Sequence, residues 1–192
     1  LIRSEPSLSN ASATADIRIR IDSLRSARAA LMKEIEGRFP DYAQLVNPKP
    51  ITIEAARAVL GSDEAMIATY VGSEETYVWA ASREGDVEFA VVDVGRKTLL
   101  ETVQSLRQAL EPDATTLGDI PDFDLPTAYK LYTKILKPVE AVWKGKKNLL
   151  VIAHGPLGRL PFSLLPTKPA GLKSDVKPLF AGYRNVPWLA RS

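Results

Sequence analysis

The segment that most constrains the fold is residues 147–167, which reads Lys-Asn-Leu-Leu-Val-Ile-Ala-His-Gly-Pro-Leu-Gly-Arg-Leu-Pro-Phe-Ser-Leu-Leu-Pro-Thr. Its apolar run, residues 149–153, is unbroken and is closed by a His-Gly-Pro turn. An uninterrupted apolar strand is typical of a parallel sheet in which both faces are covered. The run therefore predicts a buried strand in the middle of a sheet. It also places His154, the single histidine of the chain, just beyond the carboxyl end of that strand, where open α/β sheets build their sites.

The composition excludes several kinds of chemistry. The chain has no cysteine and one histidine, so it cannot supply a Cys/His dyad, a disulfide or a thiolate metal site. Its 25 basic side chains against 23 acidic ones give a formal charge of +2, which is no signal for nucleic acid or an anionic membrane. We therefore expect no metal, no cofactor, no nucleic-acid partner and no membrane partner.

Length and hydropathy indicate a soluble globular chain. With 192 residues and 45% hydrophobic residues, it can bury a core of its own. No apolar run approaches the roughly 18 to 20 residues that span a bilayer, and the N-terminus does not resemble a secretion signal. A cytoplasmic protein is expected. Because neither Leu1 nor Ser192 resembles a natural terminus, we also expect this chain to be a piece of a longer polypeptide.

The N-terminal part is predicted to be a tail followed by a helix. Residues 1–15 are rich in Ser, Ala and Asn without periodicity and predict a flexible tail or linker. From Asp16 an apolar stripe recurs at helical spacing as far as Gly37, so residues 16–37 predict an amphipathic helix. Two interpretations remain open: the helix connects to upstream repeats, or it packs on its own domain.

After two short helices, over residues 41–46 and after a cap at Thr52, a meander is expected. Residues 65–71, 76–82 and 87–94 have strand patterns separated by short polar loops, which are typical of antiparallel neighbours. Four aromatic residues lie on these strands: Tyr70, Tyr77, Trp79 and Phe89. They could stack on bases, but strand aromatics more often form cross-strand pairs, and we adopt that structural interpretation.

Two helices and a loop complete the prediction before the 149–153 run. Residues 97–110 and 127–143 are amphipathic, the latter with a kink at Pro138. Residues 111–126 between them form an acidic, proline-containing loop, whose carboxylates are predicted to be solvated rather than metal ligands or an acid/base couple. The later helix carries a series of lysines that predicts a solvated face near that loop rather than a phosphate site.

The order of these segments resembles a known family. The strand at 149–153, the Gly-Pro-Leu-Gly-Arg turn and residues 160–165 are similar to the first core segment of the CHAT domain, a caspase-like cysteine peptidase domain often fused to tetratricopeptide repeats. Three further stretches are similar to such domains in the same order: residues 38–50, 63–65 and 183–189. The resemblance thus covers most of residues 38–192.

The resemblance implies a fold and a function. The fold would be α/β, a caspase-like mixed sheet with an antiparallel meander flank and helices on both faces, incomplete at its C-terminal end. Residues 38–192 would be the N-terminal, non-catalytic part of a bacterial cysteine endopeptidase domain. Its partners would be a protein or peptide substrate, its own C-terminal half and upstream tetratricopeptide repeats.

The site residues of the family fall outside this chain. In the resembled family the catalytic His-Gly and the nucleophilic cysteine lie on later strands, and the matching position here is a turn. We therefore assign no catalytic, cofactor-binding or metal residue, and interpret His154 as a turn residue rather than the catalytic base. No serine lies in a Gly-x-Ser-x-Gly elbow.

Two alternative functions stay open beside the one that the family resemblance implies. The first is a non-enzymatic interaction module that uses the basic helix and a sheet edge to bind a protein. The second is phosphate binding through Arg159 and the lysines. The sequence also predicts a last strand at residues 185–190, which would leave an open sheet edge and make the isolated chain self-associate or bind its C-terminal half.

Overall fold

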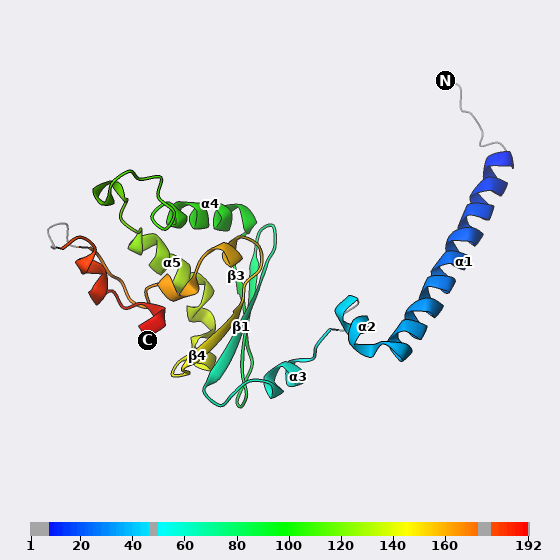
Figure 1. Cartoon of the computed structure of the whole chain (residues 1–192), viewed down its shortest axis with the longest axis horizontal. Coiled ribbons are helices and arrows are strands. Elements are labelled where there is room, and N and C mark those ends of the chain that lie inside the picture. The colour runs from blue at the N-terminus through cyan, green and yellow to red at the C-terminus, as the bar shows by residue number, and fades with distance from the viewer. Residues whose placement is uncertain (1–7, 47–49, 173–177, 192) are drawn as a thin grey trace, which may run out of the picture. The chain divides into compact units, whose positions relative to one another are not determined.

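A computed structural model describes residues 8–46, 50–172 and 178–191 (Figure 1). The chain divides into two compact units, Leu1–Ile51 and Thr52–Ser192. The first unit contains helix α1 (Leu8–Arg38) and helix α2 (Pro40–Val46). Helix α1 begins at Leu8 instead of Asp16, so residues 8–15 of the expected tail are helical. Residues 1–7 of the expected tail lie outside the described residues.

The second unit begins with helix α3 (Ile53–Ala58). Thr52 caps it as the sequence predicts: the backbone N–H of Ala55 donates to Thr52 Oγ1 at 3.2 Å. The side chain of Arg57 leaves this helix and donates from Nε to the carbonyl oxygen of Ser82 at 2.8 Å. The helix is thereby tied to the end of strand β2.

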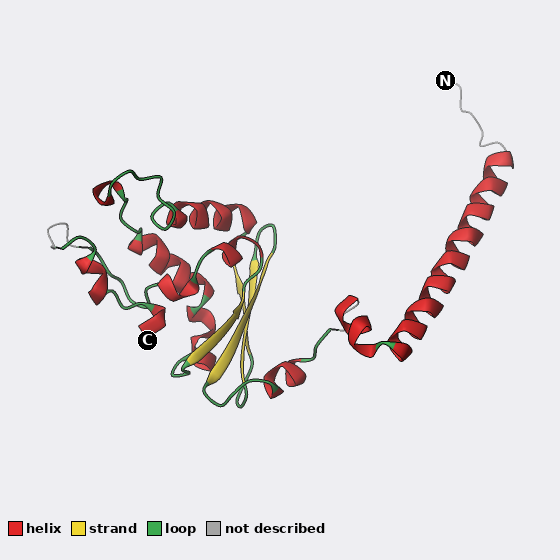
Figure 2. Ribbon diagram, in the orientation of Figure 1, coloured by secondary structure: helices red, strands yellow, loops and turns green. Residues whose placement is uncertain are grey.

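The centre of the second unit is a four-stranded mixed sheet (Figure 2). It is built from β1 (Glu64–Val71), β2 (Thr76–Ser82), β3 (Glu88–Val92) and β4 (Asn148–Ile152), in the order β3-β2-β1-β4. The first three strands pair antiparallel as a meander, and β4 pairs parallel to β1. The predicted α/β class, the meander and the parallel strand are therefore confirmed.

Three helices cover one face of this sheet: α4 (Arg96–Arg107), α5 (Leu125–Ile135) and α6 (Glu140–Trp143) (Figure 1). The helix predicted over residues 127–143 is divided into α5 and α6 by a 3₁₀ turn, Lys137–Val139, because Pro138 cannot donate the N–H that a continuous helix needs. The core joins apolar side chains of the covered sheet face to the helices, among them Ile67, Val78, Leu99, Ile135 and Leu136.

The expectation of helices on both faces is wrong for the described residues of this unit. Strand residues alternate, and those that point away from α4, α5 and α6 include half-exposed apolar side chains: Tyr70, Phe89, Val91, Leu150 and Ile152. We call these residues, with Tyr77 and Trp79 beside them, the uncovered face. Helix α3 lies near one end of the sheet and leaves these side chains exposed.

The position predicted for the 149–153 strand is also wrong. Strand β4 is an edge strand, not an interior one, and its residues alternate between partly buried and exposed. Leu150 is 44% exposed and Ile152 is 58% exposed, while Leu149 and Val151 face the helices. The unbroken apolar run arises because both faces of β4 are apolar, although only one of them is covered by described residues.

The last predicted strand does not form. Over residues 185–190 the chain passes from one 3₁₀ turn (Ala181–Asn185) to another (Leu189–Arg191). A single antiparallel bridge joins Pro166 to Trp188. Pro187 lacks the N–H that a strand would use at that position, so the pairing does not extend into a ladder.

Candidate functional site

The carboxyl ends of the parallel strands β1 and β4 are joined by His154. Its backbone N–H donates to Thr69 Oγ1 at 3.1 Å. Its Nδ1 accepts a hydrogen bond from the backbone N–H of Val71 at 3.0 Å. The imidazole also stacks on the ring of Tyr70, with centroids 4.7 Å apart and planes 10° from parallel. His154 therefore continues the pairing of the two strands beyond their last ladder residues.

These contacts define what His154 can do chemically. An imidazole nitrogen that accepts from a backbone N–H carries no proton, so the neutral ring holds its proton on Nε2. Nδ1 is already engaged, and Nε2 in this tautomer is a donor. A histidine that serves as a general base needs a ring nitrogen that can accept a proton from the nucleophile. The arrangement is that of a structural residue at a strand end.

Arg96 closes the same end of the sheet from helix α4. Its Nη2 donates to the carbonyl oxygen of Val71 at 2.9 Å, and its backbone N–H donates to Gly72 O at 3.0 Å. Gly95 before it packs so closely that a Cβ would lie 1.9 Å from Ser73 O. The turn between β1 and β2 is thus fixed against the start of α4. The sequence offered no signal for Arg96 in this role.

A cavity of about 390 Å³ lies beside β4 on the helix side of the sheet. Its apolar wall is formed by Leu149 and Val151 of β4 together with Trp143 and Phe162. Its polar lining contains Glu140 and four lysines, which are Lys144, Lys146, Lys147 and Lys168. We call it the β4 cavity. Its size is in the range of pockets that take a small ligand or a few side chains.

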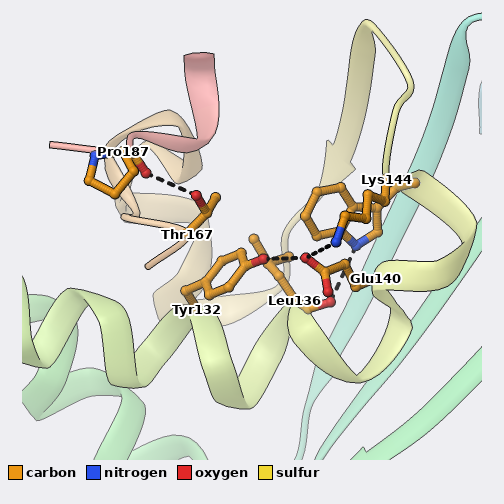
Figure 3. A network of polar contacts seen from close by, with 7 residues as sticks. Tyr132, Leu136, Glu140, Lys144, Thr167 and Pro187 are labelled. Atoms are coloured by element: carbon orange, nitrogen blue, oxygen red, sulfur yellow. Dashed lines mark hydrogen bonds and ion pairs between the residues drawn. The ribbon is translucent and has the colours of Figure 1, made fainter. Parts of the chain in front are cut away.

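A polar network forms one wall of the β4 cavity (Figure 3). Tyr132 OH donates to Glu140 Oε1 at 2.9 Å, and Lys144 Nζ lies 3.7 Å from the same oxygen. Trp143 Nε1 donates to Leu136 O at 3.2 Å. Burial raises the pKa of Tyr132, and its hydrogen bond to Glu140 raises it further. The network holds α5 and α6 together across the Pro138 break.

Lys146 and Lys147, the last two lysines of the predicted series, have their partners at the start of β1 and not in the acidic loop. Lys147 Nζ pairs with Asp63 Oδ2 at 2.7 Å, and the Lys146 ammonium donates to Ser62 O at 2.7 Å. The hydrogen bond and charge of Lys147 lower the pKa of Asp63. These contacts place the positive charge where β1 and β4 begin. Arg159 is not among the residues that line the β4 cavity, so the geometry does not favour a joint phosphate site.

The loop carboxylates have structural partners. Asp124 Oδ1 accepts from Thr127 N at 3.0 Å and caps α5, while Asp119 closes a capping box with Thr116. Asp122 accepts from Tyr183 OH at 3.3 Å. Among the described residues, no group of three or more His, Asp or Glu side chains could hold a metal ion. Asp119, Asp122 and Asp124 thus have hydrogen-bond partners that support the structure of the loop.

The strand aromatics form cross-strand pairs, but they do so on the uncovered face. Trp79 and Phe89 have centroids 5.3 Å apart, and Tyr77 lies 6.2 Å from Trp79 and 6.3 Å from Tyr70. Together with His154 they form a continuous row across the sheet. No arginine or lysine lies on these strands beside the row, so the charge that a nucleic-acid backbone needs is missing from it.

Comparison with protein-family models, with curated proteins and with solved structures gives no match. Among the described residues, no helix is long and apolar enough to cross a membrane. The functional argument therefore depends on the geometry of this chain. Two features are prominent in that geometry: the free edge of β4 with its cavity, and the uncovered face.

Proposed function

We propose that this chain supplies the N-terminal, non-catalytic part of a caspase-like cysteine endopeptidase domain of the CHAT type. The observation that carries the proposal is the free edge of β4. Strand β4 lies at the edge of the sheet and pairs with β1 alone among the described strands, and such an edge is where an α/β sheet can take further strands. The order of motifs in the sequence is what supports the choice of this family.

In this proposal a C-terminal half adds the strands that carry the catalytic histidine and cysteine. The cysteine thiolate attacks the carbonyl carbon of a peptide substrate, the histidinium protonates the leaving amine, and water then hydrolyses the acyl-enzyme. This chain contains no cysteine, and the Nδ1 of His154 is engaged by Val71. This chain supplies scaffold strands of the sheet. Tetratricopeptide repeats upstream are proposed as its other partner.

The experiment combines purified residues 1–192 with the C-terminal half of the parent polypeptide. We expect the two to co-elute in size-exclusion chromatography and to cleave a peptide library, whereas residues 1–192 alone give no turnover. Ile152→Lys, on the uncovered face of the edge strand β4, should weaken both association and cleavage. Val91→Lys, at a position of similar exposure (50% against 58%) on the opposite edge strand, is the matched control.

The outcome also decides between the two functional classes. A strictly monomeric chain that ignores the C-terminal half would overturn the peptidase proposal. The alternative would then be a non-enzymatic protein-protein interaction module. The observation that favours this alternative is the exposed apolar stripe of α1 within its own unit, which includes Ile17, Ile21, Leu24 and Leu31.

A further inference from the structure

A second cavity of the sheet-containing unit has a lining unlike that of the β4 cavity. It has a volume of about 340 Å³ and lies where the residues after α4, the acidic loop and residues 178–188 meet. Four aromatic residues line it: Phe123, Phe180, Tyr183 and Trp188. We call it the aromatic cavity. We propose that the aromatic cavity binds a quaternary ammonium group, the trimethylammonium head of choline or of a trimethylated lysine. The site is independent of the proposed peptidase role.

The aromatic rings supply the first argument. The ring centroid of Trp188 lies 6.1 Å from that of Phe123 and 6.2 Å from that of Tyr183. The ring of Phe180 lies 6.3 Å from Tyr183, so the four rings form one connected group beside the cavity. The face of an aromatic ring attracts a cation within about 6 Å of its centroid, and tryptophan does so most strongly. The lining therefore suits a cation.

The rest of the lining narrows the kind of cation. Apart from the aromatic rings, it is mainly aliphatic, with Leu110, Ile120 and Leu164 among its residues. A primary ammonium has N–H donors that would lose their partners against such a wall, at a cost in free energy. A quaternary ammonium has no N–H group and presents methyl groups instead. It is therefore the cation that an aromatic and aliphatic cavity takes at the lowest cost.

The charge beside the cavity supplies the second argument. Asp122 lies in the chain between two lining residues, Pro121 and Phe123. Its Oδ1 accepts a hydrogen bond at 3.3 Å from the hydroxyl of Tyr183, which is a neutral donor and leaves the negative charge uncancelled. Burial raises the pKa of Tyr183, and the charge of Asp122 adds to this rise against the opposing hydrogen bond from Phe123 N. A negative potential at the cavity favours a positively charged occupant.

Nearby basic side chains do not supply that charge. Arg107, the last residue of α4, pairs with Glu111 and donates to Arg159 O. Arg184 is not among the described residues that line the cavity, and none of those residues is basic. The loop over residues 111–126 carries acidic side chains only. The cavity is thus acidic at one side without a cation of the described chain inside it.

The backbone of Phe180 supplies the third argument. Its φ is 66°, in the left-handed region that a bulky residue seldom adopts, and no other non-glycine residue of the described chain has a positive φ. Strained conformations of this kind are concentrated at ligand sites. Phe180 lines the cavity while its side chain stays 41% exposed. One aromatic wall of the cavity is therefore accessible to a ligand from solvent.

The first step of the test titrates residues 1–192 with choline and follows the indole N–H resonance of Trp188. We expect saturable binding in the millimolar range, which is typical of one small group on a few rings. The matched probe is the neutral isostere of choline, in which a tert-butyl group replaces the trimethylammonium group. It should bind about tenfold more weakly, because it lacks the charge. Equal affinities, no binding of choline, or binding that leaves Trp188 unchanged would overturn the proposal.

The second step removes a charge and keeps a hydrogen bond. Asp122→Asn retains an oxygen that accepts from Tyr183 OH, and it should weaken binding of choline about threefold without changing that of the isostere. The control is Asp113→Asn, which removes the same charge from an exposed position of the same loop outside the cavity lining. If both variants bind choline equally, with unchanged circular dichroism, the cavity selects by shape alone and the proposal is wrong.

The third step removes one ring. Phe180→Leu should weaken binding of choline about threefold, because a leucine side chain has no aromatic face. The matched control is Phe89→Leu, a similarly exposed phenylalanine of the uncovered face that does not line the cavity. Both variants should keep the Tm of the wild type within a few degrees. Equal choline affinities for the two variants would contradict a ligand seated against Phe180.

The last step identifies the source of the group. Choline is compared with the amide of acetylated trimethyl-lysine and with its unmethylated counterpart. Tighter binding of trimethyl-lysine than of choline assigns the cavity to a methylated protein, and the reverse order assigns it to a small molecule. In either case the unmethylated lysine derivative should bind more weakly than the trimethylated one, because its N–H donors lose hydrogen bonds to water. Equal binding of the two lysine derivatives would overturn the assignment to a quaternary ammonium group.

Discussion

The backbone N–H of Val71 donates to Nδ1 of His154 across 3.0 Å, although the two residues are 83 positions apart. Val71 is the last residue of β1 and is fully buried. The imidazole therefore satisfies a donor at the point where the ladder between β1 and β4 has ended. This relationship makes the single histidine part of the framework and gives it a role that can be tested without any assay of activity.

The first prediction concerns this hydrogen bond. His154→Ala should lower the free energy of unfolding by roughly 1–3 kcal/mol, because it leaves the buried N–H of Val71 without an acceptor. His154→Asn keeps an oxygen acceptor two bonds from Cβ and should lose less. Urea unfolding followed by tryptophan fluorescence measures both. Equal losses in the two variants would show that the acceptor at Nδ1 contributes nothing.

The second prediction concerns the two faces of the sheet. Ile67 is fully buried on the covered face, whereas Ile152 is 58% exposed on the uncovered face. Ile67→Ala should cost roughly 2–5 kcal/mol, the range for truncating a buried aliphatic side chain. Ile152→Ala should cost less than about 1 kcal/mol, since little area is lost from the core. If the two losses are equal in urea unfolding, the assignment of faces is wrong.

Local patterns predicted most of the elements of this fold but not their neighbours. Thr52 before a short apolar-periodic segment is enough to predict a helix cap, because capping is decided within a few residues. Leu149 and Leu150 belong to the same apolar run, yet one contributes to the core and the other is exposed. That difference depends on which strands and helices lie beside β4, and no residue within the run carries this information.

The candidate site was predictable only in part, for the same reason. The end of the 149–153 run indicated where to look, and His154 does lie at the carboxyl end of β4. Its partners Thr69 and Val71 are more than 80 positions away, so the sequence could not indicate that Nδ1 is engaged. The contact between Tyr132 and Glu140 crosses the break at Pro138, which does not follow the spacing of one continuous helix.

The third prediction concerns Gly95. A methyl group there would overlap Ser73 O, so Gly95→Ala must displace the turn between β1 and β2 from the start of α4. The expected loss is about 1–3 kcal/mol, as for other overpacked sites. Gly158→Ala is the control, because its nearest contact, Ala153 O at 3.5 Å, is an ordinary van der Waals distance. Thermal unfolding should show a lower Tm for Gly95→Ala; a pair of unchanged Tm values would contradict the close approach.

The last prediction concerns stability at alkaline pH. Burial raises the pKa of Tyr132, so the folded state keeps this phenol neutral at a pH where the unfolded chain, with a tyrosine pKa of about 10, ionises. The corresponding stability is fully present below about pH 10 and is lost as the pH rises above it. The free energy of unfolding of Tyr132→Phe should therefore be about 1–2 kcal/mol lower near neutral pH, because the hydrogen bond to Glu140 is missing. Above pH 10 it should fall less steeply with pH than that of the wild type.

A second variant extends this test. Burial also raises the pKa of Tyr183, so the double variant Tyr132→Phe/Tyr183→Phe should show a still smaller loss of stability above pH 10. The measurement is urea unfolding at a series of pH values from 7 to 11. Parallel curves for the wild type and Tyr132→Phe would show that the phenol of Tyr132 ionises as readily in the folded chain as in the unfolded one.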